Sequence, residues 1–169
     1  MGQDKGLMPL SGKPMIAHVL EVVESLSERI LIVSNQDEYL QFGYPVFKDA
    51  YLEKGPLAGI YTGLLNSDTE YNIVVSCDTP FITVQLLSYL IDKSKGFEVT
   101  LPIHQGRTEQ LIGVYSKKCE SIFKEEIEKD NLKIRDAISL LPHNFVEIDA
   151  QLDFYNPNLF KNLNSLKDL

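Results

Sequence analysis

The segment Ser76-Cys77-Asp78-Thr79-Pro80 combines a carboxylate with an abrupt break in the backbone pattern. The apolar run before it, Ile73-Val74-Val75, is β-branched throughout, as in a parallel strand buried on both faces. Pro80 cannot continue a central strand, and an amphipathic helical pattern begins at Thr83. Asp78 is therefore predicted to lie at the carboxyl end of a strand, where open α/β sheets bind ligands and a carboxylate can bind a metal ion. Taken alone, Asp78 could equally cap the next helix or fix the turn.

The segments that would position Asp78 alternate between strand-like and helix-like patterns, which predicts α/β layering. We expect a three-layer α/β/α fold with a Rossmann-like, mostly parallel sheet and one antiparallel pair, formed by residues 1–169 as a single domain. The expected strands are 29–34, 46–47, 73–75, 98–103, 110–115 and 145–148. The expected helices are 14–23, 37–42, 55–66, 83–91, 119–129 and 134–141, with turn chemistry at 156–158 and a helix cap at 164–165.

Composition and residue spacing disfavour several kinds of function. The net charge is −8, and no stretch concentrates Lys or Arg with aromatic residues, so a nucleic-acid partner is not expected. The spacing of histidines and cysteines gives no zinc motif, and the cysteines are expected to be buried thiols: His18, His104, His143, Cys77 and Cys119. Without a membrane-spanning run or a signal-peptide pattern, the sequence predicts a cytoplasmic protein with no membrane partner.

Further short segments follow one another in an ordered set. They are Met1–Leu7 (MGQDKGL), Leu10–Met15 (LSGKPM), Gly55–Gly59 (GPLAG), Cys77–Phe81 (CDTPF) and Phe160–Ser165 (FKNLNS). In this order and spacing they resemble the molybdenum cofactor guanylyltransferases, the MobA family of the nucleotidyltransferase superfamily. Each motif is weak by itself, but the ordered set is strong and covers essentially the whole chain. The resemblance implies a fold like that of the nucleotide-diphospho-sugar transferases.

One part of the family pattern has no counterpart in the sequence. In the family, a strand and a glycine-rich phosphate loop, L-A-G-G-x-S-x-R, precede the motif lysine, whereas this sequence starts at the Met inside that motif. We expect the natural chain to be longer, with backbone amides of the loop cradling the phosphates. An intact mass of 19.1 kDa for the natural protein would contradict this expectation.

The resemblance implies a Mg²⁺-dependent transfer of a guanylyl group from GTP to the terminal phosphate of molybdopterin, with release of pyrophosphate. Such an in-line displacement depends on charge neutralisation and alignment. The resemblance makes Asp78 the metal-binding carboxylate and Lys5 a cation on the triphosphate. Without the flanking motif, Lys5 would be read as a solvated lysine in a flexible loop.

Two polar residues that follow short apolar strands are candidates for nucleotide binding. Asn35 and Asp49 should lie on the ligand-facing edge, where a carboxylate can accept from guanine N1–H and N2–H₂ and an asparagine can bind O6 or the sugar. The resemblance adds the start of the next helix: Gly55, Pro56, Leu57 and Gly59. Glycines there would let the backbone approach the base or ribose. An ordinary turn at Asn35 and an ordinary helix entry at 55–59 are the alternatives.

The second half of the chain is expected to bind molybdopterin. Asn162 and Asn164 match the closing asparagines of the family and are implied as contacts with this acceptor. Arg107 could pair with the acceptor phosphate, but a solvated turn residue is the favoured interpretation. The family usually has Pro-Thr where this chain has Gln110-Leu111, so the chain departs from the family pattern at this point.

Other functions stay open beside guanylyl transfer. They are a cytidylyltransferase for the same cofactor, another small-molecule nucleotidyltransferase, and a catalytically silent nucleotide-binding protein. A dinucleotide-binding protein and a serine hydrolase rank lower, because the sequence has neither G-x-G-x-x-G nor G-x-S-x-G. The sequence leaves open whether accessory or acceptor proteins of molybdenum cofactor synthesis are partners.

Overall fold

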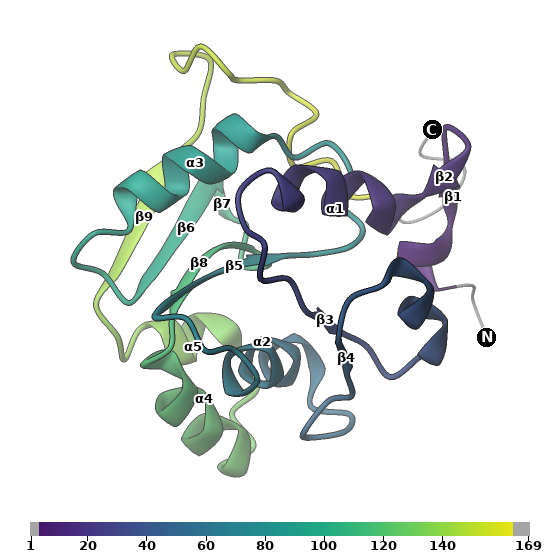
Figure 1. Ribbon diagram of the computed structural model, residues 1–169. Helices are drawn as coiled ribbons and strands as arrows, with labels where there is room; N and C mark the ends of the chain where they lie inside the picture. The colour runs from purple at the N-terminus through teal and green to yellow at the C-terminus, as the bar shows by residue number, and fades with distance from the viewer. Residues whose placement is uncertain (1–3, 164–169) are drawn as a thin grey trace.

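The computed structural model describes residues 4–163 and is shown in Figure 1. The helices are η1 Lys5–Leu7, α1 Met15–Glu24, η2 Asp37–Phe42, α2 Gly55–Leu65, α3 Val84–Lys93, α4 Cys119–Glu128 and α5 Ile134–Ile138. The strands are β1 Pro9–Leu10, β2 Lys13–Pro14, β3 Ile32–Val33, β4 Val46–Phe47, β5 Tyr71–Val75, β6 Val99–His104, β7 Arg107–Thr108, β8 Ile112–Ser116 and β9 His143–Glu147. None of the helices in this described range is long and apolar enough to cross a membrane.

The described strands form one five-stranded sheet and two small pairs. The large sheet has the order β5-β8-β6-β7, with β9 beside β6, while β3 pairs with β4 and β1 with β2. β5, β6 and β9 run in one direction, and β7 and β8 run against them. The carboxyl ends of β5 and β6 and the amino ends of β7 and β8 therefore meet at one edge of the sheet. Asp78 follows β5 at this edge.

The prediction of a mostly parallel sheet was wrong. Four of the six pairings among the described strands are antiparallel, and two of these arise because β8 lies between β5 and β6 and runs against both. β5 is half-buried and antiparallel to β8, although its apolar run predicted a parallel strand buried on both faces. A short apolar run reports burial without reporting the direction of the partner strand. The expected antiparallel pair is confirmed by the register Val99↔Tyr115 between β6 and β8.

Most of the expected strands and helices are confirmed. The expected polar turn after β6 is also present, with the positive φ at Gln105 and Gly106 of a tight hairpin turn. One expected strand is much shorter than predicted. The strand expected at 29–34 is reduced to β3, which pairs in parallel with the two-residue β4 at Ile32↔Val46. The partner strand β4 is only two residues long, which limits the length of the paired segment.

Helices cover both faces of the five-stranded sheet, which gives three layers (Figure 1). One core lies between the sheet and α2, α4 and α5, and it includes Leu57, Leu101, Tyr115 and Phe123. The other lies beneath α1 and α3, and it includes Val19, Leu86, Leu90, Ile112 and Phe160. β5 contributes to both cores, since Val74 packs into the first while Ile73 and Val75 pack into the second. Successive side chains of β5 point to opposite faces of the sheet, so β5 and the start of the Asp78 loop lie between the two helix layers.

The helix after the Asp78 loop has its own cap. Thr83 accepts a hydrogen bond from the backbone N–H of Leu86 at 3.2 Å, as an N-cap of α3. The alternative that Asp78 caps this helix is therefore wrong. The carboxylate of Asp78 is directed to other partners.

Candidate active site

Asp78 is a buried carboxylate with one partner for each oxygen. The Ser76 hydroxyl donates a hydrogen bond to Oδ1, and Nζ of Lys5 lies 3.6 Å from Oδ2. The side chain of Asp78 is 12% exposed, whereas that of Lys5 is 46% exposed. The ion pair therefore joins a carboxylate fixed within the protein to a cation that reaches solvent. This arrangement suits an anionic ligand that approaches from outside.

The short helix η1 holds Lys5 in place through its two neighbours. The Asp4 carboxylate accepts hydrogen bonds from the Gly6 backbone N–H at 3.0 Å and from the Tyr39 hydroxyl. Gly6 is buried directly against Cys77 and Tyr39. Lys5 is thus carried by a turn that is anchored on both sides of it.

Replacement of Gly6 by Ala is expected to displace this turn. A Cβ at Gly6 would lie 2.9 Å from Sγ of Cys77 and closer still to the Tyr39 hydroxyl, so the backbone around Lys5 must move. We expect a loss of about 1–3 kcal/mol of stability, typical of overpacking, together with a drop of at least about tenfold in activity. Thermal melting and steady-state turnover measure the two effects.

Gly63 in α2 provides the matched control for this substitution. A Cβ there would make only ordinary contacts, 3.7 Å from Val33, and Ala favours a helix over Gly. Gly63→Ala should melt at the same temperature as the parent or higher, with unchanged activity. Equal behaviour of the two variants would contradict the close packing of η1.

The predicted nucleotide-binding residues Asn35 and Asp49 are brought together at the ends of β3 and β4. The Asn35 side-chain amide donates to Oδ2 of Asp49 at 2.9 Å, and the Asp49 backbone N–H donates to Oδ1 of Asn35 at 3.0 Å. A Cβ built on Gly59 would lie 3.9 Å from Oδ1 of Asp49, so this carboxylate lies against α2. Asn35 is exposed, and Asp49 is partly buried. Together with Gly59 they form a small polar surface at the sheet edge.

The other residues predicted to bind the nucleotide, at the start of α2, differ in how exposed they are. Gly55 and Pro56 are exposed at the first turn, and Pro56 occupies a position where a missing N–H costs nothing. Leu57 is completely buried in the core beneath α2. Any contact of Leu57 with a nucleotide would therefore be made by its backbone.

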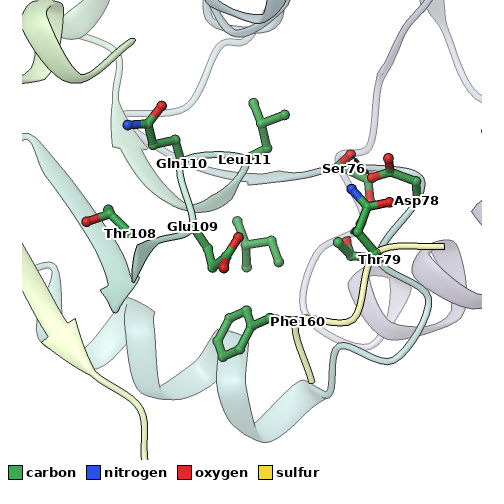
Figure 2. A pocket seen from close by; sticks show the side chains of 10 residues that line it. Ser76, Asp78, Thr79, Thr108, Glu109, Gln110, Leu111 and Phe160 are labelled. Carbon is green, nitrogen blue, oxygen red and sulfur yellow. Dashed lines mark hydrogen bonds between the residues drawn. The ribbon is translucent and has the colours of Figure 1, made fainter. Parts of the chain in front are cut away.

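A cavity of about 260 Å³ opens beside Asp78 (Figure 2). It lies between the Asp78 loop, the β7–β8 connection and the C-terminal segment, and ten residues line it: Ser76, Asp78, Thr79, Thr108, Glu109, Gln110, Leu111, Ile112, Phe160 and Asn162. The Leu163 backbone N–H donates to the Asp78 carbonyl at 3.2 Å, which ties the C-terminal segment to the loop. The structure therefore brings the predicted acceptor residue Asn162 to the same cavity as Asp78. Asn164, the other predicted acceptor residue, lies outside the described residues.

Glu109 in this cavity was not among the predicted site residues. It lies in the connection between β7 and β8, lines the same cavity as Asp78 and is half-buried. Burial raises the pKa of this carboxyl, while the charges of His104 and Arg107 act in the opposite direction. The rule that selected Asn35 and Asp49, a polar residue directly after an apolar strand, does not select Glu109, because the strand before it is the polar pair Arg107–Thr108.

The two thiols do not offer a nucleophile. Burial raises the pKa of Cys77 to about 11 and that of Cys119 to about 12. The Cys119 thiol donates to the Glu98 carbonyl at 3.3 Å. Both thiols are protonated at neutral pH; the prediction of a buried thiol is confirmed for Cys119, whereas Cys77 is partly exposed.

The donor set around Asp78 fits a Mg²⁺ ion shared with a substrate. Among residues 4–163, no three His, Cys, Asp or Glu side chains come together as a metal-binding group. Mg²⁺ in nucleotide enzymes is commonly bound by one or two carboxylates, with phosphates and water as the other ligands. Asp78 can supply such a carboxylate, and a metal held by protein ligands alone does not fit.

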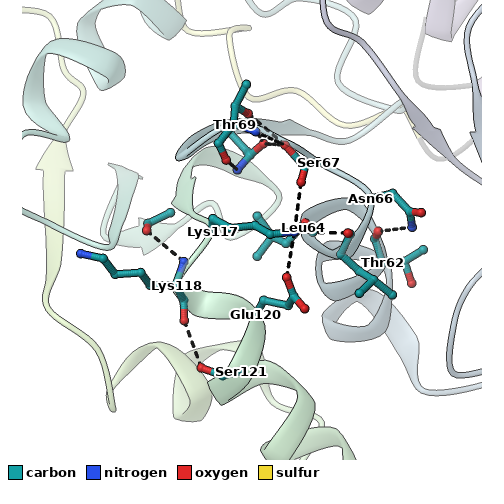
Figure 3. Close-up of polar contacts among 12 residues, drawn as sticks. Thr62, Leu64, Asn66, Ser67, Thr69, Lys117, Lys118, Glu120 and Ser121 are labelled. Atoms are coloured by element: carbon teal, nitrogen blue, oxygen red, sulfur yellow. Dashed lines mark hydrogen bonds and ion pairs between the residues drawn. The ribbon is translucent and has the colours of Figure 1, made fainter.

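The end of α2 far from the site is fixed by Lys117, as Figure 3 shows. Its Nζ donates to the carbonyls of Leu64, of Leu65 at 3.2 Å and of Ser67 at 3.0 Å, and lies 2.8 Å from the Glu120 carboxylate. A cation at a helix C-terminus satisfies carbonyls that lack helical partners. This anchor ties the C-terminal end of α2 to the segment that follows β8.

This fold and site define a nucleotidyltransferase-like α/β protein, a class to which solved structures also connect the chain. Molybdopterin-guanine dinucleotide biosynthesis protein A from Archaeoglobus fulgidus superposes with a TM-score of 0.82 at 22% identity, over 99% of this chain and 87% of that one. At this identity the likeness shows the fold.

Sequence comparison identifies the family. The family described as "MobA-like NTP transferase domain" matches residues 1–143, and the chain belongs to it. It is 37% identical to the probable molybdenum cofactor guanylyltransferase of Flavobacterium johnsoniae, over 100% of this chain and 89% of the relative. It is 33% identical to the molybdenum cofactor guanylyltransferase of Vibrio parahaemolyticus, over 99% and 85%. The resemblance found in the sequence motifs is confirmed.

Proposed function

We propose that this chain transfers GMP from GTP to molybdopterin, forming the guanine dinucleotide cofactor and releasing pyrophosphate. The observation that carries the proposal is the Lys5–Asp78 pair, 3.6 Å apart at the carboxyl end of β5 and next to the Asn162 cavity. Membership of a nucleotidyltransferase family and the names of full-length relatives support the same reaction. A cytoplasmic location, where GTP and Mg²⁺ are abundant, is part of the proposal.

The proposed reaction needs the negative charges of two substrates to be held together. Bound Mg²⁺ would supply a counter-charge for the triphosphate. Asp78 would hold the metal through a carboxylate that Ser76 orients, and Lys5 would bind phosphate oxygens. With no covalent intermediate required, the protein acts by aligning the acceptor phosphate opposite the leaving pyrophosphate.

The two halves of the chain would have separate tasks within one domain, residues 1–169. In the N-terminal half, the Asp49 carboxylate would accept from the guanine edge, Asn35 would orient it, and the α2 turn at 55–59 would border the nucleotide. In the C-terminal half, Asn162 and Asn164 would contact molybdopterin. Asp78, which follows β5 and lines the same cavity as Asn162, would act between the two substrates.

The nucleotide preference provides the first test of the proposal. We expect GTP with Mg²⁺ to raise the melting temperature more than CTP with Mg²⁺, because binding at 100 times Kd stabilises a protein by about 2.7 kcal/mol. Differential scanning fluorimetry at matched concentrations measures this. Asp49→Asn should reduce the difference, since an amide cannot accept from both guanine donors.

Equal shifts with GTP and CTP would favour a cytidylyltransferase or a generic nucleotide site. Detection of pyrophosphate and of the guanine dinucleotide product by mass spectrometry then separates catalysis from binding. Stabilisation by GTP without either product would favour the catalytically silent alternative.

A further inference from the structure

We propose that Glu109 selects the ring of the acceptor, its carboxylate accepting hydrogen bonds from two adjacent N–H donors of a pterin. The proposal rests on the function proposed above and adds to it a specificity residue that the family motifs do not contain. It follows from the place of Glu109 in the cavity, from the charges around it and from the chemistry of a pterin edge.

Glu109 projects into the cavity from the β7–β8 connection. Figure 2 shows its carboxylate facing the space above Phe160, across from Asp78 and Thr79. The backbone of Glu109 is fixed, because its N–H donates to the Pro102 carbonyl at 3.0 Å and its carbonyl accepts from the Ile112 N–H at 3.4 Å. The carboxylate is thus presented from a rigid turn.

The walls of the cavity suit a planar ring. Leu111, Ile112 and Phe160 supply apolar surface, and the volume of about 260 Å³ lies just below the range of about 300–1,000 Å³ for small-molecule pockets. A ring system fits this space better than a complete nucleotide does. Phe160 itself is held against His104, with ring centroids 4.8 Å apart.

The charges give a bound acceptor a single orientation. None of the ten residues that line this described cavity is basic, and two are acidic, Asp78 and Glu109. Beside Asp78, Lys5 and a phosphate-bound Mg²⁺ can receive an anionic phosphate, whereas the Glu109 end repels one. The neutral ring must therefore lie at Glu109 and the phosphate at Asp78.

A pterin presents adjacent donors, N3–H and the 2-amino group, on one edge of its ring. An ionised carboxylate accepts both together, and a half-buried carboxylate forms stronger hydrogen bonds than an exposed one. Burial raises the pKa of the Glu109 carboxyl, and the charges of His104 and Arg107 oppose that shift by favouring its ionised form. Of the ten residues that line this described cavity, only Asp78 and Glu109 carry charge. Glu109 is the one that lies away from the Asp78 end.

Glu109→Gln tests this inference in the complete enzyme, because an amide keeps the shape of the side chain and loses one of the two acceptors. We expect KM for molybdopterin to rise about tenfold or more, with kcat and KM for GTP within about twofold of the parent. Pterin and lumazine, which differ by a 2-amino against a 2-oxo group, serve as competitive inhibitors. The parent should prefer pterin, and E109Q should lose that preference. Glu28→Gln, an exposed glutamate on another surface, should change nothing.

An unchanged KM for molybdopterin in E109Q, with normal transfer by the parent, would overturn the inference alone. A lower kcat with an altered Mg²⁺ requirement would also overturn it, because Glu109 would then act on the metal. Failure of the parent protein to transfer GMP would overturn the proposed function and this inference together.

Discussion

Asp78→Asn is expected to lower kcat by at least about 10³-fold, because preorganised electrostatic groups of this kind contribute about 10²–10³ each and Asp78 also supports Lys5. The substitution keeps the size of the side chain and its hydrogen bond with Ser76, but it removes the charge that binds the metal and pairs with Lys5. Because Lys5 is nearly half exposed, its loss of a partner costs little stability. Turnover with varied Mg²⁺, followed as pyrophosphate release, measures the effect.

Asp92→Asn is the control for this substitution, since Asp92 is an exposed carboxylate on α3 and no proposed role depends on it. Its activity should equal that of the parent, and both variants should melt close to the parent. Retention of activity by Asp78→Asn would remove Asp78 from the proposed mechanism. A large fall in melting temperature would instead indicate that Asp78 has a structural role.

Local patterns predicted the helices well, because capping and apolar periodicity act within a few residues. For α3, the cap Thr83 and the buried Leu86, Leu87 and Leu90 are all encoded in one short segment. The same holds for η2, whose expected range 37–42 is the observed one.

The sheet could not be predicted in the same way, since strand direction depends on residues distant in sequence. Val74 pairs with Gly113, and nothing within 73–75 reports that partner. One signal was present in the other strand: glycine inside an apolar strand often marks a close backbone approach. A Cβ at Gly113 would lie 2.7 Å from the Thr100 carbonyl, in the space where β6 and β8 meet.

Sequence patterns likewise predict only part of the candidate site. Motifs and strand ends predict Lys5, Asp78, Asn35 and Asp49 one by one, without predicting which of them are in contact. The structure brings Lys5 to Asp78 and Asn35 to Asp49. Glu109 was missed because its importance comes from the cavity formed with the C-terminal segment. Such convergence of three loops has no local sequence signature.

Lys5→Met is expected to lower kcat/KM for GTP by about 10²-fold, because a neutral side chain of similar length cannot stabilise charge on the triphosphate. The effect on stability should be small, since an exposed lysine in an ion pair contributes about 0–1 kcal/mol. Lys13→Met is the control: Lys13 pairs with Glu21 on the surface, outside the proposed site. Steady-state kinetics with varied GTP measures all three proteins.

The double variant of Lys5→Met and Asp78→Asn decides whether the two residues act as a unit. Groups in contact that serve one step show non-additive effects, so the double variant should lose little more activity than Asp78→Asn alone. Strictly additive losses would indicate that Lys5 and Asp78 act at separate points, and the 3.6 Å pair would then have no joint role in holding the triphosphate. A gain of activity by the double variant over Lys5→Met would show that unpaired charge at Asp78, rather than loss of a phosphate contact, had caused the defect.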